Sequence, residues 1–154
     1  MRASTSRGRP SALFFGLAAG TFVVDQLTKV VATGRLALGS PFPLLGKWVR
    51  LTLTHNTGSA FGLVSSGWVL IGIGSIVCVV ILAYLAGGGL ARVPKRAVPL
   101  GLILGGSLGN LVDRVRSGGV IDFIDLRVWP VFNFADVAIT VGVGLLAVDV
   151  LRRR

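Results

Sequence analysis

The amino-acid sequence predicts an all-α membrane protein with four transmembrane helices. Of its 154 residues, 53% are hydrophobic and only 14% are charged, whereas an average soluble domain carries about 25% charged residues. A helix needs about 20 mostly apolar residues to cross a bilayer. Four stretches meet this requirement: residues 12–31, 68–86, 98–115 and 132–151. A soluble helical bundle is disfavoured, because its helices would need polar stripes and the second stretch has none.

The first apolar stretch follows three arginines, so a cleaved signal peptide is an alternative interpretation of it. However, the stretch has no A-x-A-like cleavage site followed by a soluble domain, and three more apolar stretches come after it. We therefore expect it to be retained as the first span. Residues 1–10 are expected to form a basic cytoplasmic tail, and residues 11–154 a single membrane domain.

Basic residues predict the orientation of the spans. They gather in three regions: Arg2, Arg7 and Arg9 at the N-terminus, Arg92, Lys95 and Arg96 between the second and third spans, and Arg152, Arg153 and Arg154 at the C-terminus. With four spans these regions share one side, which the positive-inside rule makes the cytoplasm. Topology and contact with anionic membrane lipids then explain the net charge of +10, and no nucleic-acid partner is expected.

The loops on the opposite side contain strand-like patterns. Residues 47–55 alternate between apolar and polar side chains, which is the period of a half-buried strand. Residues 119–126 form a second, shorter extended run. We expect these segments to form a small extracytoplasmic β-sheet on the outer membrane surface.

Composition limits the chemistry that the chain can perform. It has one cysteine, one histidine and no glutamate. These counts exclude a disulfide framework, a Cys/His zinc cage and an HExxH metallopeptidase. Neither a metal nor another cofactor is expected.

Polar residues inside the apolar segments indicate a functional site, because an intramembrane ionisable group is costly. They lie at the outer ends of the first, third and fourth spans and in the outer loops, while the cytoplasmic halves are nearly free of them apart from Asp149. The group consists of Asp25, Lys29, Asn110, Asp113, Arg114, Asn133 and Asp136 in the spans, with Asn56 and Asp122 in the loops. This convergence predicts one site at the outer boundary of the bilayer.

Two aspartates in this group can form an acid–base pair. Like charges a few Å apart cannot both ionise, so the pair shares one proton and can hydrolyse a peptide bond with water alone. Each aspartate has the alternative of an ion pair with a basic neighbour, which is favoured for Asp113 beside Arg114 and for Asp25 near Lys29. Asp122 and Asp136 have no basic neighbour at helical spacing, which favours them as the reacting pair.

Three other classes of function are compatible with parts of this pattern. A channel or transporter also places polar residues in its spans, but they usually lie at the midplane. A serine peptidase would use Ser107 or Ser59 as nucleophile, with His55 or Lys29 as base. A non-enzymatic assembly subunit would leave the clustering at the outer face unexplained.

Five motifs occur in a fixed order along the chain. They are DQLTK (residues 25–29), HNTGSAFG (55–62), GGSLGNLVDR (105–114), VIDFIDL (120–126) and FNFADVAITVG (132–142). Over residues 14–151 the chain thereby resembles the lipoprotein signal peptidases, or signal peptidase II, which are bacterial inner-membrane aspartic peptidases with four spans.

The resemblance implies an activity and a set of site residues. The implied activity removes the signal peptide of diacylglyceryl-modified prolipoproteins on the N-terminal side of the lipidated cysteine. The implied catalytic pair is Asp122 and Asp136, and a role in substrate binding or site support is implied for Asp25, Lys29, Asn56, Asn110, Asp113, Arg114 and Asn133. The resemblance also implies a short outer helix beside the sheet. A monomer is expected, in the bacterial cytoplasmic membrane, with the active site at its outer face.

One departure from the family concerns the segment between the two aspartates. Only 13 residues separate Asp122 from Asp136, which is short for the family, and the segment contains Trp129 and Pro130. We expect this difference to affect how substrate enters. Asp125, three residues beyond Asp122, is a weaker competitor for the catalytic role.

Overall fold

A computed structural model describes residues 8–46, 48–58 and 66–152. Four long helices form a bundle: α1 (Gly8–Arg35), α2 (Gly67–Ala86), α4 (Ala97–Ser117) and α5 (Phe134–Leu151). Each corresponds to one of the four apolar stretches, and α1 is about four residues longer at each end than predicted. Residues 8–10 of the predicted tail form the first turn of α1, while residues 1–7 lie outside the described residues.

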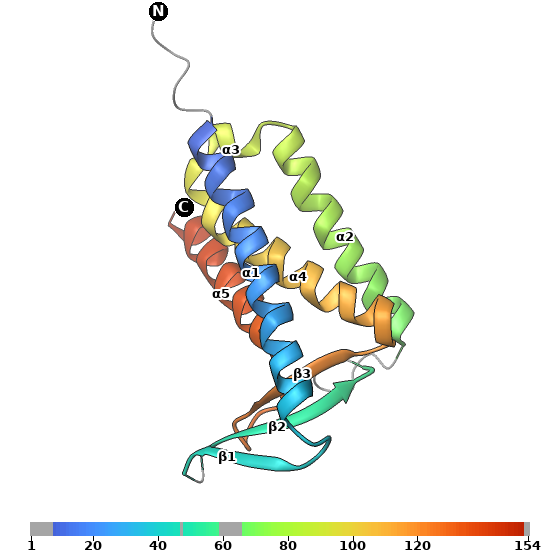
Figure 1. The fold of residues 1–154 in the computed structure, drawn as a ribbon. Helices are drawn as coiled ribbons and strands as arrows, with labels where there is room; N and C mark the ends of the chain where they lie inside the picture. The colour runs from blue at the N-terminus through green and yellow to red at the C-terminus, as the bar shows by residue number, and fades with distance from the viewer. Residues whose placement is uncertain (1–7, 47, 59–65, 153–154) are drawn as a thin grey trace, which may run out of the picture.

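Three of these helices are long and apolar enough to cross a membrane, at Arg9–Arg35, Gly67–Ala86 and Phe134–Leu151. Helix α4 does not qualify on composition, because glycines interrupt its apolar residues and one end is polar. It lies among the other helices, packed against α1, α5 and α2 (Figure 1). Close packing between helices favours small residues such as glycine, which lowers the mean hydropathy of the packed helix.

Two neighbouring glycines of α4 let α1 and α5 approach it from different sides. A Cβ on Gly105 would meet the carbonyl oxygen of Ala18 on α1, and a Cβ on Gly106 would meet that of Ala135 on α5, in both cases closer than side chains tolerate. The interfaces with α1 and α5 therefore depend on backbone-to-backbone contact, as is common for membrane helices. This close packing fixes the polar ends of α1, α4 and α5 relative to one another.

A three-stranded antiparallel sheet lies at one end of the bundle (Figure 1). Its strands are β1 (Pro41–Leu45), β2 (Val49–Asn56) and β3 (Val120–Asp125), in that spatial order. The predictions at 47–55 and 119–126 are confirmed as β2 and β3. Strand β1 was not predicted, since its two prolines weaken the pattern; they are tolerated because β1 is an edge strand.

The sheet is fixed to the helices by a small apolar cluster and by a tight turn. Ala32 of α1 packs with Leu53 and Phe123 of the sheet. Gly118 ends α4 in a left-handed conformation, with φ of 77°, and its amide N–H donates to the carbonyl oxygen of Arg114. Because of this turn, β3 starts directly beside the polar end of α4.

The short outer helix is not seen among the described residues on the sheet side, where 59–65 fall outside the description. The short helices α3 (Gly89–Arg92) and η1 (Pro94–Arg96) connect α2 to α4 at the other end of the bundle, where α1 begins and α5 ends (Figure 1).

Candidate active site

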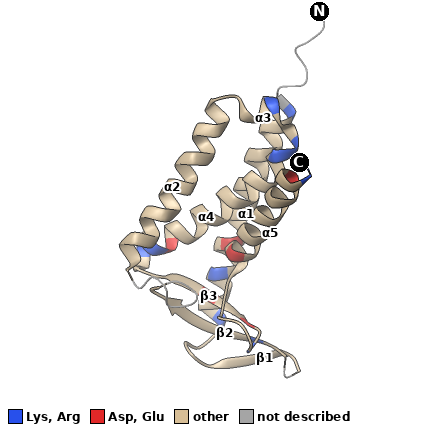
Figure 2. Cartoon of the chain, turned by 180° about the vertical axis from the view of Figure 1, so that it is seen from behind, with Lys and Arg blue, Asp and Glu red and all other residues tan. Residues whose placement is uncertain are grey.

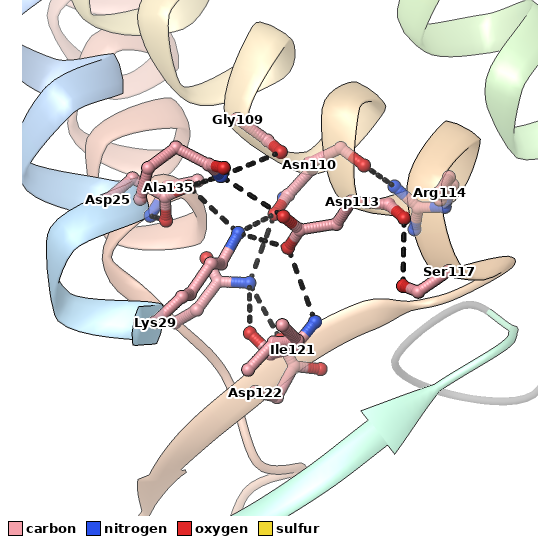
Figure 3. Close-up of polar contacts among 12 residues, drawn as sticks. Asp25, Lys29, Gly109, Asn110, Asp113, Arg114, Ser117, Ile121, Asp122 and Ala135 are labelled. Atoms are coloured by element: carbon pink, nitrogen blue, oxygen red, sulfur yellow. Dashed lines mark hydrogen bonds and ion pairs between the residues drawn. The ribbon is translucent and has the colours of Figure 1, made fainter. Parts of the chain in front are cut away.

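The predicted site residues meet where the bundle touches the sheet. Figure 3 shows Asp25, Lys29, Asn110, Asp113, Arg114 and Asp122 among them. They come from α1, α4, β2, β3 and the start of α5, which are far apart in sequence. Six of them are buried: Asp25, Lys29, Asn110, Asp113, Asp122 and Asn133. The polar residues that lie near the ends of the predicted spans and in the loops thus come together at one end of the bundle.

Lys29 lies at the centre of the helical part of this site. Its Nζ lies 2.8 Å from an Asp25 carboxylate oxygen, 2.7 Å from Asp113 Oδ2 and 3.0 Å from Asn110 Oδ1. Its side chain is only 2% exposed. The expected pairing of Asp25 with Lys29 is thus present, but Asp113 pairs with Lys29 rather than with Arg114. Consecutive helical residues point in different directions, so Asp113 faces α1 while its neighbour does not.

Asp25 and Asp113 each also bind a backbone amide next to one of the predicted catalytic residues. Asp25 Oδ1 accepts a hydrogen bond of 3.0 Å from the amide of Ala135, which precedes Asp136. Asp113 Oδ2 accepts one of 3.3 Å from the amide of Ile121, which precedes Asp122. The two buried carboxylates, joined by Lys29, therefore hold both of the segments that carry the predicted pair.

Gln26 belongs to this network, although sequence reasoning did not select it. Its Nε2 donates to Asp113 Oδ1 at 3.0 Å and to Asp25 Oδ2 at 3.2 Å. The signal that identifies it is its place in the DQLTK motif, three residues before Lys29 and on the same face of α1.

Asn133 connects β3 to α5. As the N-cap residue of α5, it accepts a hydrogen bond from the Asp136 amide at 2.9 Å, and Asp136 Oδ2 accepts one from the Asn133 amide, which completes a capping box. Its Nδ2 donates to Asp122 Oδ1 at 2.7 Å and to Asn110 Oδ1 at 3.0 Å. One side chain thus fixes the helix start that carries Asp136 and contacts Asp122 directly.

Asp122 and Asp136 line one cavity of about 250 Å³, together with Arg114 and Trp129. Each carboxylate is held by amide donors. Asp122 Oδ2 accepts from Asn56 Nδ2 at 3.0 Å, and Asp136 Oδ1 accepts from Asn110 Nδ2 at 2.8 Å. Removal from water, and secondarily the negative charge of Asp136, raises the pKa of Asp122 to about 6. The cavity therefore holds two nearby carboxyl groups, one of which keeps its proton to a higher pH than usual.

A family model described as Signal peptidase (SPase) II matches residues 17–152. The chain belongs to the signal peptidase II family. A lipoprotein signal peptidase of Moorella thermoacetica is 42% identical over 142 residues, covering 90% of this chain and 92% of the relative. The Brevibacillus brevis protein of the same name is 38% identical over 140 residues, covering 89% and 93%.

Two solved structures share the fold. A bacterial membrane enzyme determined by the in meso method at 2.3 Å superimposes with a TM-score of 0.82 at 28% identity, covering 90% of this chain and 87% of the other. A second such structure, at 1.9 Å, also gives a TM-score of 0.82, at 27% identity, covering 92% and 94%. The resemblance seen in the five motifs is thus confirmed at the level of the family, and membership of a peptidase family follows from it.

The remaining aspartates of this signal peptidase II chain have structural partners away from the cavity. Asp125 accepts from Arg50 Nη2 at 2.6 Å and from Thr52 Oγ1 at 2.8 Å on β2. Burial alone would raise the pKa of Asp125, but hydrogen bonds from Thr52, the Arg127 amide and Arg50 lower it. Asp149, near the end of α5, pairs with Lys95 and Arg96 at the opposite end of the bundle.

The two bases considered for a serine peptidase are engaged elsewhere. Lys29 is surrounded by three oxygens, and His55 Nε2 lies 3.2 Å from Ser117 Oγ. Ser59 lies outside the described residues. Among the residues that the structure describes, no group of three or more His, Cys or Asp side chains is placed to hold a metal ion.

Proposed function

We propose that the chain cleaves the signal peptide from diacylglyceryl-modified prolipoproteins, N-terminal to the lipidated cysteine, with Asp122 and Asp136 acting on a water molecule. The names of the relatives supply the substrate class. The observation that carries the catalytic assignment is that these two carboxylates line one cavity, each held by asparagine amides.

The chemistry needs one proton shared between the two carboxyl groups. The ionised carboxylate takes a proton from water as the water oxygen attacks the scissile carbonyl carbon. The protonated carboxyl group donates a hydrogen bond to the carbonyl oxygen, which carries the developing negative charge. The tetrahedral intermediate then collapses, the C–N bond breaks, and the leaving amine of the cysteine takes up a proton from the dyad.

In this proposal Asp25, Lys29 and Asp113 are positioning residues. Asp25 accepts a hydrogen bond from the Ala135 amide and Asp113 accepts one from the Ile121 amide, and these bonds hold the backbone on the N-terminal side of each catalytic aspartate. Lys29 neutralises part of the charge of the Asp25 and Asp113 carboxylates and keeps these two groups at a fixed separation. A shift of about 1 Å in catalytic groups can cost on the order of 100-fold in rate, so this network determines whether the dyad is productive.

Arg114 is proposed to bind the substrate backbone. It lines the cavity with both aspartates, and its buried Nε has no hydrogen-bond partner among the described residues. Because a buried donor without a partner is costly, we assign it to a carbonyl of the bound peptide. Asn56, Asn110 and Asn133 hold the carboxylates and complete the support.

A more apolar cavity of about 310 Å³ adjoins the first, and the two share Trp129, Phe132, Asp136 and Thr140. Its other lining residues are mostly apolar and include Leu126, Val137 and Val141. We assign this cavity to an apolar part of the substrate. The short segment between Asp122 and Asp136 forms one wall of both cavities through Trp129 and Phe132. Its length would therefore affect how substrate enters them.

The proposed setting is the bacterial cytoplasmic membrane. Residues 11–154 form one domain in which α4, enclosed by the other helices, is a span in addition to the three apolar ones. Both termini face the cytoplasm, and the site faces outward at the membrane surface. The three apolar helices and the basic residues at the end opposite the sheet support this orientation (Figure 2). A monomer suffices for the proposed chemistry, since one chain supplies both carboxylates.

The test is a cleavage assay with one prolipoprotein in two forms, with and without the diacylglyceryl group on its cysteine. The wild-type enzyme is expected to release a product with the lipidated cysteine at its N-terminus, identified by mass spectrometry, and to leave the unmodified form intact. Ser107→Ala is expected to retain activity. Cleavage of another bond, or equal cleavage of both forms, would contradict the proposed substrate; loss of activity in Ser107→Ala would favour the serine peptidase.

A further inference from the structure

Positive charge gathers at the end of the bundle opposite the active site (Figure 2). The described basic residues there are Arg9, Arg92, Lys95, Arg96 and Arg152. Asp149 is the one acidic residue at this end among the described residues, and it pairs with both Lys95 and Arg96. Two cations therefore share one carboxylate, and this end keeps a positive excess.

A groove of about 260 Å³ lies between α4 and α5 at this end. One side is lined by Lys95 of η1 and by Val98 and Pro99 of α4, and the other by Leu145, Val148 and Asp149 of α5 and by Arg152 directly after it. The charged residues are at the end of the helices, and the apolar ones lie deeper along them. Val98, Leu145 and Val148 are 36–45% exposed, so the apolar walls of the groove face the surroundings of the bundle.

The two basic residues of η1 have different roles. Arg96 donates from Nε to Asp149 at 3.0 Å and from Nη1 to the Tyr84 hydroxyl at 3.3 Å, and its guanidinium lies 5.9 Å from the centroid of the Tyr84 ring. It is thereby fixed between helices. The Lys95 side chain is 60% exposed, and an ammonium group has three donors, so its pairing with Asp149 leaves donors for a ligand in the groove.

We propose that this groove binds one anionic phospholipid, with the phosphate against Lys95 and Arg152 and an acyl chain along Val98, Leu145 and Val148. The occupant must be negative at the helix ends and apolar along the helices, and it must reach the groove from the bilayer. An anionic phospholipid has this combination, and basic pockets between transmembrane helices at the cytoplasmic side are suited to such headgroups. The site is independent of the proposed catalytic reaction.

The test measures lipid retention by native mass spectrometry of the full-length protein in detergent, with phosphatidylglycerol or phosphatidylcholine of identical chains. Wild type is expected to retain phosphatidylglycerol preferentially. The double variant Lys95→Gln/Arg152→Gln is expected to weaken this retention by about fivefold for each cation removed. The matched control Arg35→Gln/Arg116→Gln removes equal charge at the sheet end and is expected to leave retention unchanged.

Two further measurements separate a lipid groove from general attraction of anions. Val148→Trp fills the groove without changing charge, so it is expected to reduce phosphatidylglycerol retention, and inorganic phosphate is expected not to displace the lipid. Equal retention of both lipids, equal loss in the Arg35/Arg116 control, full retention in Val148→Trp, or displacement by phosphate would each overturn the proposal.

Discussion

Replacing Lys29 with methionine tests how the buried charges hold the site. The substitution keeps an unbranched side chain that ends one atom short of Nζ, and it removes the ammonium group that joins Asp25 and Asp113. The side chains of Asp25 and Asp113 are 0% and 5% exposed, so in the variant both carboxylates would stay buried without the cation that they share. Removing one partner of a buried pair costs about 3–5 kcal/mol. This is a large part of the 5–15 kcal/mol that ordinarily stabilises a folded domain.

The assay is thermal or denaturant unfolding in detergent, with Lys95→Met as the matched control. Lys95 also pairs with an aspartate, Asp149, but its side chain is 60% exposed, so its removal is expected to cost about 0–1 kcal/mol. A second variant, Lys29→Met/Asp113→Asn, removes one of the stranded charges and is expected to recover at least about 1 kcal/mol. If Lys29→Met is no less stable than Lys95→Met, or the double variant recovers nothing, the charge-network argument is wrong.

Three further predictions concern single residues. The pKa of Asp122 is raised from 3.8 to about 6 in the folded state, so the folded state binds more protons than the unfolded state between these values and stability falls as pH rises. Relative to Asp122→Asn, wild type is expected to lose about 3 kcal/mol of unfolding free energy between pH 3 and pH 7, and parallel pH profiles of unfolding free energy for the two proteins would refute this. Gly109→Ala places a Cβ against the Asp25 carboxylate and is expected to lower the free energy of unfolding by about 1–3 kcal/mol. The control Gly144→Ala adds a Cβ in open space and is expected not to destabilise the protein, so equal melting temperatures of the two variants would show that the close contact at Gly109 is unimportant. Asp125→Asn is expected to keep full cleavage activity because its partners lie on the sheet, and an inactive but folded variant would make Asp125 a catalytic candidate.

Much of the fold could be predicted because a bilayer imposes a simple length rule on apolar segments. The four stretches became the four long helices, and the alternation at 47–55 became β2. Strand β1 escaped prediction because its pairing with β2 overrides the low strand propensity of its prolines. The composition of α4 is explained only by its packing, since the helix is shielded by α1, α2 and α5.

The site residues could be selected from sequence, but their pairings could not. Spacing along one helix predicted the contact between Asp25 and Lys29, because the two residues are four positions apart. Proximity in sequence gave the wrong partner for Asp113, because the cation that binds it lies on α1, 84 residues earlier. The hydrogen bonds that Asp25 and Asp113 accept from the Ala135 and Ile121 amides depend on tertiary structure alone. No pattern in the sequence predicts them.

The most direct test of the account is the turnover of lipidated prolipoprotein by folded Asp122→Asn and Asp136→Asn variants, with wild-type enzyme as reference. Loss of a general acid or base costs about 100- to 10,000-fold, so each variant is expected to fall by at least about 100-fold while keeping its melting behaviour. Substantial turnover by either folded variant would contradict the central claim that these two carboxylates perform the cleavage.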